Sequence, residues 1–182
     1  GPPADVALMA GVLAARGLTD LAVLTTDAAP LPANHAPAAP TRDGILAAMK
    51  DMAARAVAGD TVVFYFSGHG AQAPDLSGDE GGGFDEILLP ADAAGWNGAA
   101  GGVQNALLDD DLQLWAQGLL SRGVRLVGVI DACHSATGFR ALGGRGVARG
   151  LPAEALGVPE GPPAAPQPVV GDLAGEFVFL YS

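Results

Sequence analysis

The feature that most constrains the fold of this chain is the run 61–66, TVVFYF, in which every residue is β-branched or aromatic. No polar residue alternates through it, which is typical of a strand buried on both faces of a parallel sheet. Similar runs occur at 124–130 and 176–181, and we expect the last to be another central strand. Parallel strands need crossover connections, usually helices that cover both faces of the sheet. The runs therefore predict an α/β fold with a mostly parallel central sheet.

Helices are predicted between these strands by the spacing of the apolar residues. One spans 4–16 and ends at Gly17, and a second begins after Thr41, whose hydroxyl suits an N-cap. A third begins at the acidic triplet 109–111, because carboxylates are favourable at a helix N-terminus. The apolar residues 21–24 predict a short additional strand.

Length and composition predict a single domain over 1–182. The 182 residues are 49% hydrophobic and 16% charged, which is enough apolar material for one core. We expect that core over 1–140, a flexible loop rich in Gly and Pro from about 138 to 175, and the final strand at 176–181. The apolar piece 87–90 predicts a small hairpin strand within a region rich in Gly, Ala and acidic residues.

The net charge of the chain narrows the choice of partners. It is −11 at pH 7, with nine Lys and Arg residues in all, whereas contact with phosphates depends on such cations. Nucleic acid is therefore not an expected partner, and cationic peptides fit better. No run of eighteen apolar residues occurs, and the first residues lack the pattern of a signal peptide. We expect no membrane contact and a cytoplasmic location by default.

One cysteine, Cys133, occurs in the chain, which excludes an internal disulfide and a zinc site of paired cysteines. It follows the run 124–130 closely, as His69 follows 61–66, and sites in open α/β sheets gather at such strand ends. A thiol attacks well only as the thiolate, and a histidine is the usual base. The alternative is a buried, inert thiol. We expect Cys133 to be a nucleophile and His69 to be its base.

Gly68 and Gly70 flank His69. Glycine leaves the backbone free to turn sharply and lets a substrate approach closely. We expect the amides of Gly70 and Cys133 to face the oxyanion that develops when a thiolate attacks a carbonyl group.

Two short motifs contain these residues, FSGHG at 66–70 and DACHS at 131–135. They resemble the catalytic motifs of metacaspases and of their bacterial relatives, the orthocaspases, in order and in strand context. The resemblance covers most of 4–140 and extends to FDE at 84–86 and to the acidic triplet. It implies a caspase-like fold and a cysteine endopeptidase that works through an acyl-enzyme. The excess of Arg over Lys and the many Ala and Gly residues favour a bacterial member.

The resemblance also implies a pocket for a cationic side chain. Asp131 matches the family's carboxylate at the base of that pocket, Asp5 matches a second acid, and Ser67 matches a serine in the pocket wall. Two carboxylates in a partly dehydrated pocket bind a guanidinium or an ammonium strongly. Cleavage after Arg or Lys is therefore expected. Each acid also has an alternative to a role in the pocket: Asp5 could be a helix N-cap, and Asp131 could cap the end of its strand.

The chemistry itself requires no cofactor, but the resemblance implies Ca²⁺ (calcium) as an activator. Asp85, Asp109 and Asp110 match three of the family's carboxylate ligands, and calcium prefers such hard oxygen ligands. The position of a fourth carboxylate is taken by Arg140, whose positive charge weakens such a site. The alternative is that the triplet simply begins a helix on a solvated acidic face.

Three further expectations accompany the resemblance. Autoprocessing is expected within 139–150, where Arg140, Arg145 and Arg149 lie among glycines. A monomer is expected. A strand before the first residue and further elements after the last are also expected, so that this chain lacks the first strand and the C-terminal elements of the fold.

Other functions stay open beside the peptidase. A catalytically silent interaction module would keep the fold, although the intact Cys133, His69 and Asp131 argue against it. A related cysteine hydrolase with a different pocket preference fits the same motifs, because motifs indicate chemistry better than specificity. A nucleotide-binding domain is weakly supported, because no phosphate-binding loop of the P-loop type occurs.

Overall fold

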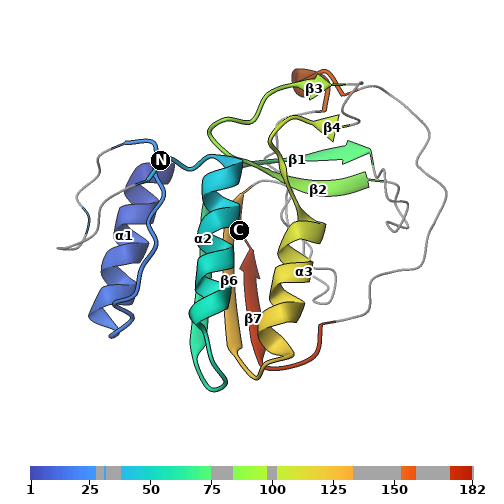
Figure 1. Cartoon of the computed structure of the whole chain (residues 1–182). Helices are drawn as coiled ribbons and strands as arrows, with labels where there is room; N and C mark the ends of the chain where they lie inside the picture. The colour runs from blue at the N-terminus through green and yellow to red at the C-terminus, as the bar shows by residue number, and fades with distance from the viewer. Residues whose placement is uncertain are drawn as a thin grey trace.

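The computed structural model describes most of the chain (Figure 1). The described residues are 1–27, 31, 38–74, 84–97, 102–132, 153–158 and 173–181. Their centre is a five-stranded sheet in the order β5–β2–β1–β6–β7. Its strands are β1 (Thr61–Pro74), β2 (Phe84–Leu89), β5 (Leu107–Leu108), β6 (Arg125–Ala132) and β7 (Phe177–Tyr181).

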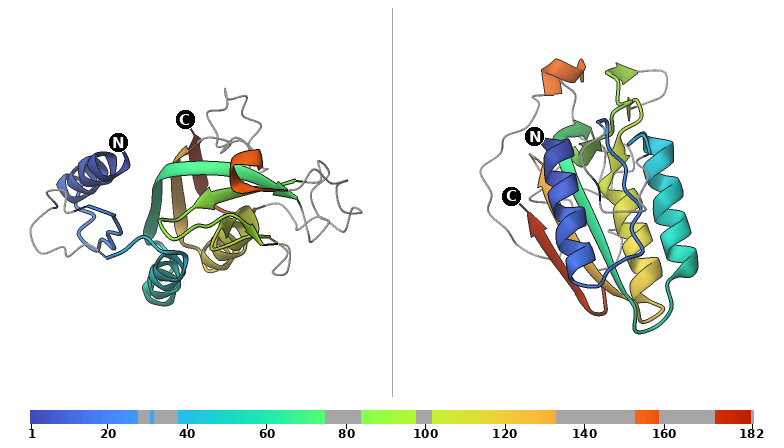
Figure 2. Two further views of the ribbon diagram at one scale, coloured as in Figure 1. Left: turned by 90° about the horizontal axis from the view of Figure 1, so that it is seen from above. Right: turned by 90° about the vertical axis from the view of Figure 1, so that its left-hand side faces the viewer.

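Among the described residues, three α-helices flank the sheet: α1 (Pro2–Ala15), α2 (Arg42–Arg55) and α3 (Asp109–Leu120). Helices α2 and α3 cover one face of the sheet, whereas α1 lies on the other side (Figure 2). This arrangement confirms the predicted α/β fold with helices on both faces. No helix in the described part of the chain combines the length and the apolar character needed to cross a bilayer.

Strand β1 is longer than the sequence predicts and changes partner along its length. Its first half pairs with β6 in parallel, from Thr61↔Arg125 to Gly68↔Ala132. Its second half pairs with β2 in antiparallel fashion, beginning at His69↔Leu89. The expectation that the strand ends at residue 66 is therefore wrong, because a second partner strand continues the ladder through residues that resemble a loop in sequence. The expected hairpin strand at 87–90 is confirmed as part of β2.

The main core fills the space between the sheet and helices α2 and α3. Leu126 and Ile130 of β6 and Leu112 and Leu119 of α3 are almost fully buried there. The indole Nε1 of Trp115 donates a hydrogen bond of 2.8 Å to a backbone carbonyl of α2 and thereby ties the two helices together. This packing stabilises the strands whose ends form the candidate site.

The helices begin and end close to the predicted residues, because caps and glycines in the local sequence set these limits. Thr41 Oγ1 accepts a hydrogen bond of 3.1 Å from the amide of Gly44, which confirms the expected N-cap of α2. The chain leaves α1 at Gly17, whose φ of 87° is accessible mainly to glycine. The acidic triplet forms the first turn of α3.

Two strand expectations need correction. Residues 21–24 form no strand, because their ladder consists of a single parallel bridge, Leu24↔Ala38. Strand β7 lies at the edge of the described sheet and not at its centre, since β6 is its one neighbour in the strand order.

A small second layer lies above β2. Strands β3 (Trp96–Asn97) and β4 (Gly102–Val103) pair with each other, and the short 3₁₀-helix η2 (Ala153–Leu156) lies beside them (Figure 1). Val158 is buried in this layer. Residues 153–158 and 173–175 are the described part of the stretch that we expected to be a flexible loop, and that expectation stays a prediction.

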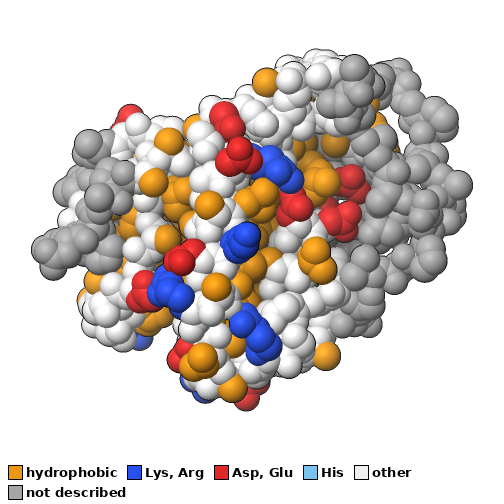
Figure 3. Space-filling view, in the orientation of Figure 1, with side chains coloured by type: hydrophobic (Ala, Val, Ile, Leu, Met, Phe, Trp, Pro, Cys, Tyr) orange, Lys and Arg blue, Asp and Glu red, His pale blue; other side chains and the backbone are white. Residues whose placement is uncertain are grey.

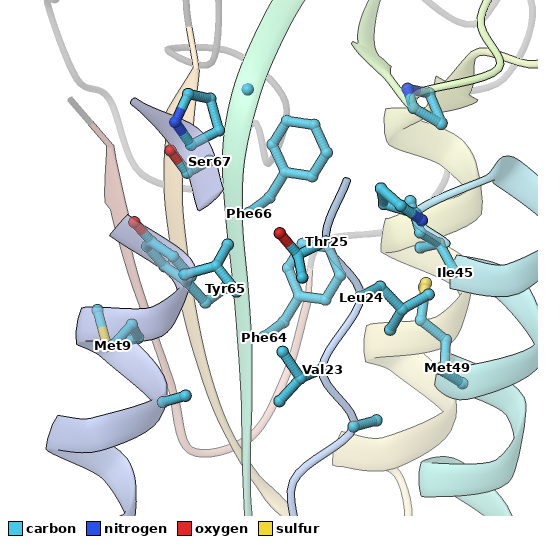
Figure 4. Close-up of a pocket in the computed structure, with 18 of the residues that line it drawn as sticks. Met9, Val23, Leu24, Thr25, Ile45, Met49, Phe64, Tyr65, Phe66 and Ser67 are labelled. Carbon is cyan, nitrogen blue, oxygen red and sulfur yellow. The ribbon is translucent and has the colours of Figure 1, made fainter. Parts of the chain in front are cut away.

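A deep apolar groove separates α1 and the segment 18–27 from strand β1 and helix α2. Its volume is about 700 Å³, and its walls include Met9 of α1, Val23, Met49 of α2 and Phe64 of β1 (Figure 4). The edge of β1 opposite β6 faces this groove over the residues before His69 and has no strand partner among the described residues.

Candidate active site

The two predicted strand ends are neighbours in the sheet. Strands β1 and β6 run parallel, with Ser67 opposite Asp131 and Gly68 opposite Ala132. Ala132 directly precedes Cys133 in the sequence, and Gly68 directly precedes His69. The register therefore brings the two catalytic motifs side by side as far as the last described residue of β6. Cys133 itself falls outside the described residues, as do Arg140, Arg145 and Arg149.

His69 is an exposed residue within a regular strand. It lies opposite Leu89 of β2, and the buried Gly70 lies opposite Leu88. The sharp turn expected at these glycines is absent, because β2 holds this segment in an extended ladder. Gly68 has a different reason to be glycine: an added Cβ would lie 2.9 Å from the ring of Phe66. Close packing of that ring keeps the position before His69 free of a side chain.

The three residues expected to form an acidic pocket, Asp5, Ser67 and Asp131, lie near one another in the structure. The hydroxyl of Ser67 donates a long hydrogen bond of 3.4 Å to Asp5 Oδ2, which joins β1 to the first turn of α1. Asp131 is exposed and lies opposite Ser67 in the parallel register. The N-cap of α1 is Gly1, so Asp5 is not the cap that the alternative supposed. Helix α1 thus brings one carboxylate into contact with Ser67, and β6 places a second opposite it in the register. We refer to Asp5, Ser67 and Asp131 as the acidic group.

Tyr65 belongs to the same group, and our sequence analysis missed it. Burial raises the pKa of its phenol, the charges of Asp131 and Asp5 raise it further, and a side-chain hydrogen bond with Ser67 works in the opposite direction. Side chains two residues apart on a strand share a face, so Tyr65 and Ser67 point the same way. Counting back two residues from Ser67 would have found it.

The three implied calcium ligands lie at the junction of β2 and α3. Asp85 and Asp109 are 5% and 8% exposed, so they do not form the solvated face of the alternative interpretation. Burial, followed by the charges of Asp85 and Asp110, raises the pKa of Asp109 to about 8. In the space-filling view, acidic side chains gather near the N-terminal end of α3 (Figure 3). The structure therefore brings these carboxylates together.

The carboxylates of this acidic cluster are suitable calcium ligands, but their arrangement does not favour metal binding. Within the described ranges, no three or more His, Cys, Asp or Glu side chains are arranged to hold a metal ion. Asp111, the third member of the triplet, is held elsewhere by a 2.9 Å ion pair with Arg42 Nη2. Glu86, a neighbour that we had assigned no role, accepts a 2.9 Å hydrogen bond from Gln72. The oxygen ligands suit calcium, but the described side chains do not form a finished site for it.

Known proteins with similar sequences are metacaspases. The chain is similar to metacaspase-1 from Pyricularia oryzae, with 42% identity over 115 residues, which are 63% of this chain and 26% of that protein. It is also similar to metacaspase-1 from Cryptococcus neoformans, with 39% identity over 118 residues, or 65% of this chain and 23% of that protein. The chain thus spans about a quarter of the length of these curated relatives.

A solved structure and a family model extend the likeness to most of the chain. The crystal structure of protein GSU0716 from Geobacter sulfurreducens matches with a TM-score of 0.53 and 30% identity, over 74% of this chain and 42% of that one. The model of the metacaspase, peptidase C14 domain, matches residues 1–141. That match includes both motifs and all of the residues that we assign to the site. The chain therefore belongs to the metacaspase family and carries its peptidase C14 domain.

Proposed function

We propose that this domain is a cysteine endopeptidase that cleaves peptide bonds after Arg or Lys through Cys133 and His69. The observation that carries the proposal is the parallel register of β1 and β6, which places Gly68 beside Ala132. The two residues that follow in sequence are the imidazole and the thiol that such chemistry needs. Membership of a peptidase family supports the same conclusion.

The proposed reaction proceeds in two halves. The Cys133 thiolate attacks the carbonyl carbon of the substrate, and the electron pair of the C=O bond moves to oxygen, where amides of Gly70 and Cys133 donate hydrogen bonds. The C–N bond then breaks, and the His69 imidazolium gives its proton to the leaving amine. In the second half, a water molecule loses a proton to His69 and attacks the thioester. The product acid leaves, and the thiolate is regenerated.

The acidic group at Ser67 supports the proposed substrate class. Asp5 and Asp131 place two carboxylates around one serine, and the chain as a whole carries a net charge of −11. A substrate with a guanidinium or ammonium group is attracted by both the local and the overall charge. Basic peptides are therefore the proposed partners, and nucleic acids are not.

Covalent labelling tests the proposed nucleophile independently of turnover. A peptidyl-arginine chloromethyl ketone should add one inhibitor mass to Cys133, found by mass spectrometry of the digested protein. The variant His69→Ala should slow the labelling, because the thiolate loses its base, and Cys133→Ala should abolish it. Labelling at equal rates by the matched peptidyl-aspartate reagent would contradict the pocket assignment. A thiol that resists both reagents in the folded protein would contradict the nucleophile.

Calcium activation is a separate proposal that rests on the resemblance and on the acidic cluster. Isothermal titration calorimetry with calcium chloride should detect binding that Asp109→Asn weakens. Asp111→Asn is the matched control, because Arg42 already holds that neighbouring carboxylate away from the cluster. Equal binding by both variants, or no heat with the unaltered protein, would refute the proposal.

Autoprocessing is likewise a proposal, based on the three arginines within 139–150. Intact-mass measurements during incubation should show fragments that end at Arg140, Arg145 or Arg149. These fragments should be absent from Cys133→Ala and from a variant with all three arginines replaced by glutamine. A chain that stays intact while it cleaves added peptides would rule the proposal out.

A further inference from the structure

Strand β1 presents two chemically different faces. Phe64 and Phe66 point towards the side of Leu24 and α2, whereas Tyr65 and Ser67 point towards α1 (Figure 4). The parallel register places Asp131 opposite Ser67 and Val129 opposite Tyr65, so these side chains share the second face. The aromatic side chain of Tyr65, which carries a hydroxyl group, therefore lies on the same face as Ser67, the central residue of the acidic group.

The geometry places Tyr65 beside the acidic group. It shares a face of β1 with Ser67 (Figure 4), whose hydroxyl donates to Asp5 and which lies opposite Asp131 in the register. Burial and, after it, the charges of Asp131 and Asp5 raise the pKa of the Tyr65 phenol, which agrees with this placement. Tyr65 and Ser67 also line the apolar groove, whereas Asp5 and Asp131 do not. The tyrosine thus borders the apolar groove and is also a neighbour of the acidic group.

We propose that Tyr65 is a specificity-determining residue that makes this site prefer arginine to lysine. The inference rests on the proposed function and sharpens it. A guanidinium is planar, can pair with two carboxylates at once and stacks on aromatic rings. An ammonium is a compact, strongly hydrated point charge that lacks the planar fork of the guanidinium and gains less from stacking on a ring. Asp5 and Asp131 supply the two acids from different elements, and Tyr65 supplies a ring on the same face of β1 as Ser67.

Substitutions at Tyr65 separate the ring from the hydroxyl. In Tyr65→Leu, the ratio of kcat/KM for matched Arg and Lys peptides should fall about tenfold, the size of a partly desolvated cation–π contact. The loss should lie mainly in KM for the Arg peptide. Tyr65→Phe keeps the ring and should restore most of the ratio. Phe64→Leu, an equal loss of ring from the opposite face of the same strand and outside the motif at 66–70, is the matched control and should leave the ratio unchanged.

A binding measurement distinguishes failure of this inference from failure of the proposed function. In Cys133→Ala, calorimetry should show tighter binding of a peptide ending in Arg than of one ending in Lys, and Tyr65→Leu should remove the difference. If the unaltered protein cleaves neither peptide but this binding pattern holds, the chemistry is wrong and the role of Tyr65 stands. If cleavage occurs but Tyr65→Leu changes neither the kinetic nor the binding ratio, Tyr65 has no part in specificity.

Discussion

Ser67 is the residue at which the candidate site is assembled. Its hydroxyl contacts Asp5 of α1, its strand neighbour across the register is Asp131 of β6, and Tyr65 stands two positions before it. Asp5 and Asp131 are both more than 60 residues from Ser67 in the sequence, and Tyr65 alone is a near neighbour along the chain. The site therefore depends on the packing of α1 against the sheet as much as on the motif that contains the serine.

Removal of one acid at a time should weaken the binding of basic substrates. We expect Asp131→Asn and Asp5→Asn each to lower kcat/KM for an Arg peptide by about tenfold or more, the value of one charge-assisted hydrogen bond. Because the change removes binding of the substrate and not the nucleophile, the labelling of Cys133 by small neutral reagents should stay unchanged. Steady-state kinetics and iodoacetamide labelling check the two halves of this expectation. Equal loss in both assays would contradict it.

Asp109 should make stability depend on pH in an unusual direction. Its pKa is raised from 3.8 to about 8, so the fold favours the protonated acid. Below about pH 4 this carboxyl is protonated in both the folded and the unfolded chain. As the pH rises towards about 8, the unfolded chain loses the proton more readily than the folded one, so the free energy of unfolding falls. In the presence of a chelator, the melting temperature should therefore fall over this range, and less so in Asp109→Asn. Parallel pH profiles for the two proteins would show that this carboxyl titrates normally.

At the scale of elements, β6 and β7 are held together by a close contact that only glycine permits. A Cβ added at Gly128 would lie 2.1 Å from the ring of Phe179, which packs over the strand from β7. Gly128→Ala should therefore lower the free energy of unfolding by about 1–3 kcal/mol, the usual cost of overpacking a core.

Gly118 in α3 is the matched control for that substitution. It is exposed, and an added Cβ would meet nothing within 4 Å. Gly118→Ala should raise stability by about 0.5–1 kcal/mol, because alanine favours the helix more than glycine does. Urea denaturation of both variants measures the two effects, and a destabilised Gly118→Ala or an unchanged Gly128→Ala would contradict the packing described here.

The helices and the buried strands were largely predictable from the sequence, because their signals are local. Thr41 caps α2, the acidic triplet begins α3, and the β-branched runs form β1 and β6. The extension of β1 through His69 was not predictable, since its glycines resemble a loop and only β2 makes them a strand. In the site, family motifs predicted Asp5 and Ser67, whereas Tyr65 carries no motif signal and emerges only from strand alternation and burial.

At the scale of the whole molecule, charge should govern how substrates arrive. With a net charge of −11, the domain attracts cationic peptides over distances that salt shortens to about 10 Å at 0.1 M. The kcat/KM for a peptide with several basic residues should therefore fall several-fold as sodium chloride is raised, mainly through KM. A peptide with a single Arg and compensating acids is the control. Equal salt dependence for both peptides would show that the overall charge has no role.

The central claim is that a thiol and an acidic pocket act together in this domain. Its most direct test is the hydrolysis of two fluorogenic peptides that differ only in Arg or Asp before the scissile bond, by the unaltered protein and by Cys133→Ala. We predict cleavage of the Arg peptide alone, and its complete loss in Cys133→Ala. Cleavage that survives in Cys133→Ala, or a preference for the Asp peptide, would contradict the account.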